Sequence, residues 1–122
     1  MKYKEYKDKV YGVQYIFILD VVDYDKAVNK FKKENKKLYK VFGEKLSTYD
    51  RDFSGVTFIN GSNILIMVKE NKDKAFKIAT IGHELLHASL FAFEGRGVEV
   101  DLSKNNEHLT YYFDHLLYEV LK

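Results

Sequence analysis

Residues 78–90 contain His83-Glu84-Leu85-Leu86-His87, two histidines and a glutamate whose spacing suits metal chemistry. On a helix, residues four positions apart lie one turn apart on the same face, so both imidazole rings would project together. Two neutral imidazole nitrogens can then bind one Zn²⁺ at about 2.0–2.1 Å. Glu84 would lie about 100° around the helix from His83, beside the ion, where its carboxylate can take a proton from metal-bound water. The string therefore predicts two metal ligands and a general base.

The residues around this string are mostly apolar, which predicts that the helix is buried. The apolar positions are Ala75, Ile78, Ala79, Ile81, Leu85, Leu86, Ala88 and Leu90. A buried histidine pair needs polar partners, because unpaired polar groups are costly in an apolar interior. The alternative interpretation is a pair of surface histidines, or of hydrogen-bonded core histidines. We favour the metal interpretation, since chance gives such a string in roughly one percent of chains of this composition.

A catalytic zinc site normally uses three protein ligands and keeps one open position for water. The chain has no cysteine, so the third ligand must be a histidine or a carboxylate. The downstream candidates are Glu94, Glu99, Asp101, Glu107, His108, Asp114 and His115. Glu94 follows His87 by two turns of the same helix, about 10 Å, and can hardly share the ion. Glu99 and Asp101 lie in a turn that could swing back, and Glu107 begins the next predicted helix.

Composition and charge limit the class of protein. A chain of 122 residues with 46% hydrophobic and 16% aromatic content predicts one domain, 1–122, with an ample core. The net charge of +2 gives little reason to expect a nucleic acid partner. No window approaches the roughly 18 apolar residues of a membrane span, and no signal-peptide cleavage site follows the N-terminal apolar run. We therefore expect a cytoplasmic protein without a membrane partner; no feature indicates an oligomeric state.

The first half of the chain predicts one strand and one helix. Residues 10–19 are aromatic and β-branched, which is typical of a largely buried strand. Residues 26–41 carry apolar side chains near one face and lysines elsewhere, which predicts a helix. Gly43 is a plausible stop for that helix, and residues 44–54 then read as a loop.

The second half predicts a hairpin and two helices. Residues 56–59 and 64–68 are short apolar runs that flank the turn Asn60-Gly61-Ser62-Asn63, which predicts a β-hairpin. The motif helix should run over 74–93, and the last helix from Ser103 or Asn105 to about Leu121. The order β, α, β, β, α, α predicts an α+β domain with a sheet of about three strands packed on three helices.

The string His83-Glu84-x-x-His87, followed after 19 residues by Glu107 on a second predicted helix, resembles the gluzincin arrangement of thermolysin-type zinc peptidases. The wider run, residues 81–88 followed by Asn105-Asn106-Glu107-x-x-x-Tyr111, is similar to small metallopeptidases encoded by phages and prophages. The resemblance covers roughly residues 56–121. It implies a minimal zincin-like domain that binds one Zn²⁺ through His83, His87 and Glu107, with Glu84 as the base.

The resemblance departs in size, and we do not expect in these 122 residues the larger C-terminal domain of thermolysin-type enzymes, which supplies a histidine that stabilises the transition state. We therefore expect another side chain to stabilise the oxyanion, and helical phase suggests Tyr111 or His115. Asp114 or Asp101 could accept the second N–H of a ligand histidine and so fix its tautomer. For each of these four residues, the alternative is a surface polar side chain or a packed tyrosine.

These observations predict a zinc-dependent metallopeptidase that cleaves a peptide or protein substrate. The strand at 64–68, just before the motif helix, could offer an edge to which an extended substrate adds. One alternative is a zincin-like protein-binding module with a structural or vestigial metal, in which a fourth ligand such as His108 or Asp101 closes the site. Another is a protease dedicated to one regulatory partner, such as an immunity repressor of a mobile element.

Overall fold

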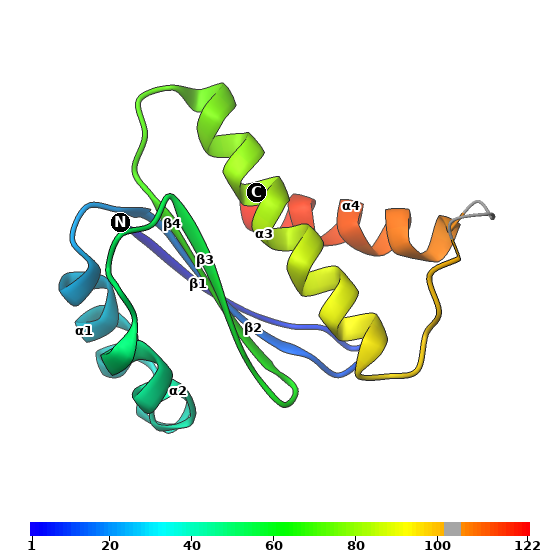
Figure 1. Cartoon of the computed structure of the whole chain (residues 1–122), viewed down its shortest axis with the longest axis horizontal. Coiled ribbons are helices and arrows are strands. Elements are labelled where there is room, and N and C mark those ends of the chain that lie inside the picture. The colour runs from blue at the N-terminus through cyan, green and yellow to red at the C-terminus, as the bar shows by residue number, and fades with distance from the viewer. Residues whose placement is uncertain (102–105) are drawn as a thin grey trace.

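The computed structural model describes residues 1–101 and 106–122, which form a four-stranded mixed sheet with helices on both faces (Figure 1). The strands are β1 (Lys2–Lys7), β2 (Gln14–Val21), β3 (Gly55–Asn60) and β4 (Asn63–Lys69), and the helices are α1 (Tyr24–Glu34), α2 (Lys36–Thr48), α3 (Lys74–Glu94) and α4 (Glu107–Leu121). The predicted α+β class is confirmed, although the described residues hold four strands and four helices instead of three of each.

The strand order β1-β2-β4-β3 places β2 and β4 inside the sheet and β1 and β3 at its edges. The central pair β2/β4 is parallel, and both outer pairs are antiparallel. Successive side chains of a strand point to opposite faces. In β2, Tyr15 and Phe17 pack against α3 and α4, whereas Ile16 and Ile18 pack against α1 and α2. Burial on both faces explains why β2 and β4 read as continuous apolar runs.

The sequence analysis did not predict β1, whose residues are Lys-Tyr-Lys-Glu-Tyr-Lys. This strand has no apolar face of the usual kind, because its two partly buried tyrosines, Tyr3 and Tyr6, lie on opposite faces of the sheet. It is antiparallel to β2, with Lys2 opposite Leu19 at one end and Lys7 opposite Gln14 at the other. Lys4 Nζ also donates a hydrogen bond of 2.5 Å to the Glu119 backbone carbonyl of α4. Lysines on an edge strand also discourage pairing with another chain.

The strand predicted over 10–19 begins later, at Gln14, because Asp8 organises a turn before it. Asp8 is almost completely buried, and its carboxylate accepts hydrogen bonds from the Val10 and Tyr11 N–H groups at 2.9 and 3.1 Å. Local bonds of this kind compete with a strand ladder for the same backbone groups.

The prediction of a single helix over 26–41 is wrong, because Asn35 separates two helices, α1 and α2. The Asn35 N–H donates to the Phe31 carbonyl at 2.8 Å and ends α1, while its side chain accepts from the Leu38 N–H at 3.0 Å and caps α2. Gly43 does not stop α2, which continues to Thr48 because Phe42 and Leu46 are buried on either side of it. The loop predicted over 44–54 is therefore helical in its first part.

The predicted hairpin and motif helix are confirmed. Asn60 and Asn63 pair at the end of the β3–β4 ladder, and Gly61 adopts a left-handed φ of 60° in the turn. Asp73 caps α3 by accepting from the Phe76 N–H at 3.1 Å. The predicted starting residues of the last helix, Ser103 and Asn105, lie outside the described part of the chain. Within that part, no helix combines the length and apolarity needed to cross a membrane.

Candidate metal centre

Helix α3 packs on the β3–β4 half of the sheet and carries the histidine motif (Figure 1). Its inner face, which includes Ile81, Leu85 and Ala88, is buried against the sheet and α4. The prediction of a buried helix holds for this face only, since Ile78, Leu86 and Leu90 are exposed. Sheet and α4 cover only part of the helix, and the uncovered part presents both histidines to solvent.

The Nε2 atoms of His83 and His87 lie 3.2 Å apart, and the two ring planes meet at 81°. Two nitrogen ligands of a tetrahedral Zn²⁺, each at about 2.0–2.1 Å, would lie about 3.3 Å apart. The rings therefore already converge at the spacing of two ligands of one ion. The His83 side chain is 67% exposed, so an ion could reach the pair from solvent.

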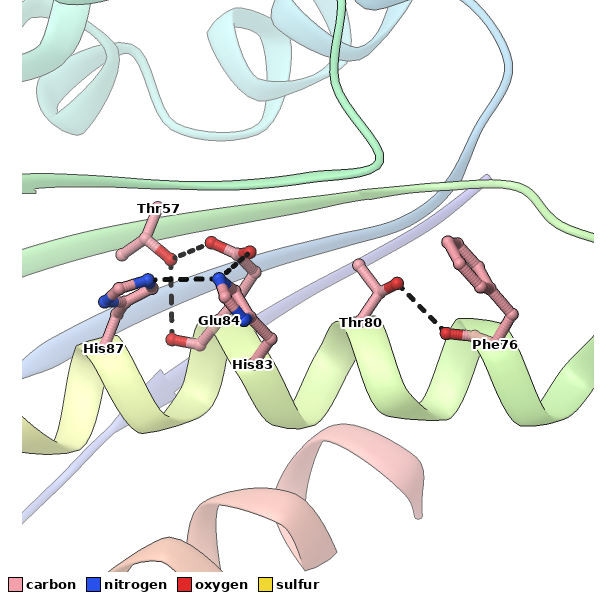
Figure 2. A network of polar contacts seen from close by, with 6 residues as sticks. All are labelled: Thr57, Phe76, Thr80, His83, Glu84 and His87. Atoms are coloured by element: carbon pink, nitrogen blue, oxygen red, sulfur yellow. Dashed lines mark hydrogen bonds and ion pairs between the residues drawn. The ribbon is translucent and has the colours of Figure 1, made fainter.

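Glu84 lies beside this pair and is held by the edge strand (Figure 2). The residue is only 6% exposed, and its Oε1 atom accepts a hydrogen bond of 2.8 Å from the Thr57 hydroxyl group of β3. Its other oxygen, Oε2, lies 3.8 Å from His83 Nε2. The carboxylate thus stands next to the position that an ion shared by the histidines would occupy.

The motif lies along the edge of the sheet, because β3 runs beside α3. The prediction that residues 64–68 offer this edge is wrong, because they belong to β4, which lies between β2 and β3. In the part of the chain that the structure describes, no strand pairs with the outer side of β3. The free edge beside the histidines is therefore that of Gly55–Asn60.

Three hollows surround the centre. One of ≈ 340 Å³ opens beside Gly55 and Phe76, and a second of ≈ 370 Å³ lies near Ile59 and Phe91 at the far end of β3. Both are lined partly by residues of β3 and of α3. The first includes His83 and Glu84 themselves, and the second begins at Phe91, one turn beyond His87. The third, ≈ 430 Å³ and mostly apolar, runs between α3 and α4. Its lining residues are Ala79, Gly82, His83, Leu86, Leu109, Thr110, Phe113 and Asp114.

The structure does not bring Glu107 to the histidine pair. Glu107 is the exposed first residue of α4, half a helical turn away from the buried stripe of Tyr112, Leu116 and Val120. Among the residues that the structure describes, no three His, Asp or Glu side chains form a group that could hold a metal ion. Two of the three ligands implied by the resemblance are thus together, and the third is not.

The other predicted site residues also lie apart from the pair, except that Asp114 shares the α3–α4 groove with His83. His115 is hydrogen-bonded at 2.5 Å to the Tyr6 hydroxyl group of β1. Tyr111 is exposed on α4, and the Asp101 N–H donates to the Asn106 side chain. His108, predicted as a fourth ligand in a closed site, stacks on Phe93, and its Nε2 lies 3.1 Å from the Glu99 carbonyl oxygen.

Sequence reasoning missed Thr57, the polar partner of Glu84. It reads as an ordinary strand residue, and nothing in its local pattern connects it with a glutamate 27 positions later. Its place on the sheet face toward α3 could have been read from strand alternation. Its contact with Glu84 requires the packing of α3 against β3.

Comparisons with protein-family models, curated proteins and solved structures give no match for this chain. The class established here is accordingly that of the fold, an α+β domain with a four-stranded mixed sheet in the described residues.

Proposed function

We propose that this protein is a zinc-dependent metallopeptidase that cleaves an extended peptide lying along the free edge of β3. The observation that carries the proposal is the geometry of the motif itself. Two imidazole nitrogens lie 3.2 Å apart on the exposed face of α3, with the fixed carboxylate of Glu84 beside them. The same 3.2 Å spacing is that of a hydrogen bond between two neutral imidazoles, and binding of zinc would replace this bond.

His83 and His87 would hold the ion, since their Nε2 atoms lie 3.2 Å apart. Bound zinc would supply Lewis acidity, which acidifies a water molecule and polarises a carbonyl group. Glu84 would accept the proton of the attacking water on its carboxylate and pass it to the leaving amine. Its burial and its bond to Thr57 keep the carboxylate beside the histidines instead of in bulk solvent.

The third ligand would be Glu107, which is proposed from the resemblance alone, since the structure leaves this residue apart from the histidine pair. Asp114 is the competing candidate, because it lines the same groove as His83. A histidine pair completed by one carboxylate would leave the open coordination position that hydrolysis needs. The same resemblance supports a phage or prophage origin.

The substrate would be bound by strand addition. A free strand edge offers a row of backbone N–H and C=O groups to an extended peptide, and pockets beside it select the side chains. No strand of the described residues pairs with the outer side of β3, where the Ile59 carbonyl accepts from Lys45 Nζ, and a hollow lies toward each end of the strand. A peptide on this edge would pass directly in front of the histidines.

The decisive experiment is Glu84→Gln in protein whose zinc content is measured by mass spectrometry. Glutamine keeps the shape of the side chain and an acceptor for Thr57 but cannot take a proton. We expect about one zinc per chain in both proteins and loss of peptide hydrolysis in the variant. Full activity in the variant would rule out Glu84 as the base and, with it, this mechanism.

A protein-binding module is the second candidate, and two observations favour it. The described residues provide two convergent histidines without a third ligand, and α3 exposes Phe76, Leu86, Leu90 and Phe91. Zinc-loaded wild-type protein that binds a partner protein without cleaving any peptide would support this function. Cleavage of one partner protein, with no general peptidase activity, would instead indicate a dedicated protease.

A further inference from the structure

Thr57 lies in the middle of β3 and Glu84 in the middle of α3, and their side chains meet (Figure 2). The Thr57 Oγ1 atom is 2.8 Å from Glu84 Oε1 and 3.5 Å from the Glu84 backbone carbonyl oxygen. A hydroxyl group has a single proton to donate. The shorter distance, and the greater strength of bonds to a charged acceptor, direct that proton to the carboxylate.

This bond makes the two carboxylate oxygens of Glu84 different. Oε1 is occupied by Thr57, whereas Oε2 faces the histidine side, 3.8 Å from His83 Nε2. Rotation of the carboxylate would break the bond to Thr57 and leave a buried acceptor unsatisfied, which is costly. The hydroxyl group therefore selects one orientation of the carboxylate.

Gly55, two residues before Thr57 on the same strand, closes the other side. A Cβ atom on Gly55 would lie 3.0 Å from Glu84 Cγ and 3.2 Å from Oε2. The glutamate side chain thus fits tightly against the strand on one side and is hydrogen-bonded on the other. Both constraints come from β3, and neither comes from the helix that carries the motif.

We propose that Thr57 is a positioning residue, whose hydroxyl group aims the free oxygen of Glu84 at the histidine pair. The inference rests on the proposed function, because the value of this orientation is that Oε2 is the atom that receives the proton. Catalytic groups held in one orientation avoid the loss of rate that accompanies small misplacements. The Thr57 hydroxyl group touches neither the water nor the substrate in this role.

Thr57→Val and Thr57→Ser test it, because valine keeps the branched shape without the hydroxyl group and serine keeps the hydroxyl group. The contact itself is measured first in metal-free protein, by a double-mutant cycle of Thr57→Val and Glu84→Ala on the unfolding equilibrium. We expect a coupling of about tenfold in the unfolding constant, typical of a hydrogen bond to a charged group. Additive effects of the two substitutions would overturn the inference.

The second measurement uses zinc-loaded protein and an internally quenched peptide library with acetylated N-termini and amidated C-termini. We expect Thr57→Val to lower kcat about tenfold or more, with KM and zinc content unchanged, and Thr57→Ser to recover most of the loss. Thr48→Val, which removes a hydroxyl group bonded only to helix carbonyls at the end of α2, is the matched control.

The outcomes are distinguishable. Wild-type kcat in Thr57→Val would overturn the positioning role and leave the proposed function standing. Parallel losses of kcat and zinc in Thr57→Val, without recovery in Thr57→Ser, would indicate a purely structural role and also overturn it. Absence of hydrolysis in zinc-loaded wild-type protein would overturn the proposed function and this role together, even where the metal-free cycle shows the contact.

Discussion

Gly55 of β3 packs against Glu84 of α3 so closely that no side chain fits between them. An added Cβ atom would lie 2.7 Å from Thr80 Cγ2 and 3.0 Å from Glu84 Cγ. These distances are shorter than ordinary van der Waals contact, so the Thr80 and Glu84 side chains must shift, or β3 and α3 must move apart, to admit a methyl group. The spacing between the edge strand and the motif helix therefore depends on a glycine at this position.

Gly55→Ala should destabilise the protein by about 1–3 kcal/mol, the usual effect of overpacking, and should displace Glu84. Chemical denaturation measures the free energy of unfolding. Gly43→Ala is the matched control, because nothing lies within 4 Å of a Cβ atom there and the residue sits inside α2. That substitution should stabilise the helix by about 0.5–1 kcal/mol. Equal effects at the two glycines would contradict the close packing at Gly55.

Removal of either motif histidine should abolish stoichiometric zinc binding. A single imidazole cannot replace the convergent pair, whose Nε2 atoms lie 3.2 Å apart. Mass spectrometry of His83→Ala and His87→Ala tests this, with His115→Ala as the control, because His115 is bonded to Tyr6 on the β1 side of α4. Zinc retained in both motif variants would refute the metal centre.

The third ligand can be assigned by comparing Glu107→Gln with Asp114→Asn. On the resemblance, Glu107→Gln should weaken zinc binding by more than the tenfold to hundredfold that follows the loss of an outer-shell partner. Asp114→Asn should then have the smaller effect. Competition with a chromogenic chelator measures both affinities. The reverse order would assign the ligand to Asp114, which lies beside His83 in the α3–α4 groove.

Peptide binding at both ends of β3 predicts that internal bonds are cleaved. Peptides with blocked termini should be cleaved about as well as free ones, because one hollow is lined by His83 and Glu84 and the other lies beyond His87. Phe76→Ser and Phe91→Ser should each raise KM about tenfold if the rings bury substrate side chains. Ile78→Ser is the matched control. Ile78 lies on the same helix, is 47% exposed, compared with 50% for Phe76 and 46% for Phe91, and lines neither hollow. A requirement for a free terminus would be evidence against this binding mode.

A buried chain of hydrogen bonds predicts how stability depends on pH. The Tyr112 hydroxyl group donates to Asp8 at 2.9 Å and lies 2.5 Å from the Tyr15 hydroxyl oxygen. Burial raises the pKa of both tyrosines well above the usual value near 10, and for Tyr112 the neighbouring Tyr15 and Asp8 raise it further. The folded state therefore keeps protons that the unfolded state loses.

Stability from these tyrosines should be complete below about pH 10 and should fall as pH rises above it, by at most about 1.4 kcal/mol per pH unit for each group. Tyr112→Phe should make the free energy of unfolding fall less steeply with pH. It should also lower that free energy by about 1–3 kcal/mol at neutral pH, because the buried Asp8 loses a hydrogen-bond donor. Urea denaturation between pH 7 and 11 measures both effects. The exposed neighbour variant, Tyr111→Phe, should behave as the wild type does.

Local patterns were sufficient for several elements. The Asn60–Asn63 turn, the cap at Asp73 and the helical spacing of the histidines each depend on residues within a few positions, so the hairpin and α3 could be predicted. The break at Asn35 was also local in origin. It was missed because the apolar pattern runs through it, although asparagine can both end one helix and cap the next.

The sequence by itself determined that His83 and His87 share one face of a helix, since that follows from 3.6 residues per turn. It could not determine which strand lies beside them, because strand order depends on contacts between distant segments. Only the tertiary structure placed β4 inside the sheet, β3 at its edge and the Thr57 hydroxyl group on Glu84. It also left Glu107 apart from the histidines, because the position of α4 is set by the burial of Tyr112, Leu116 and Val120.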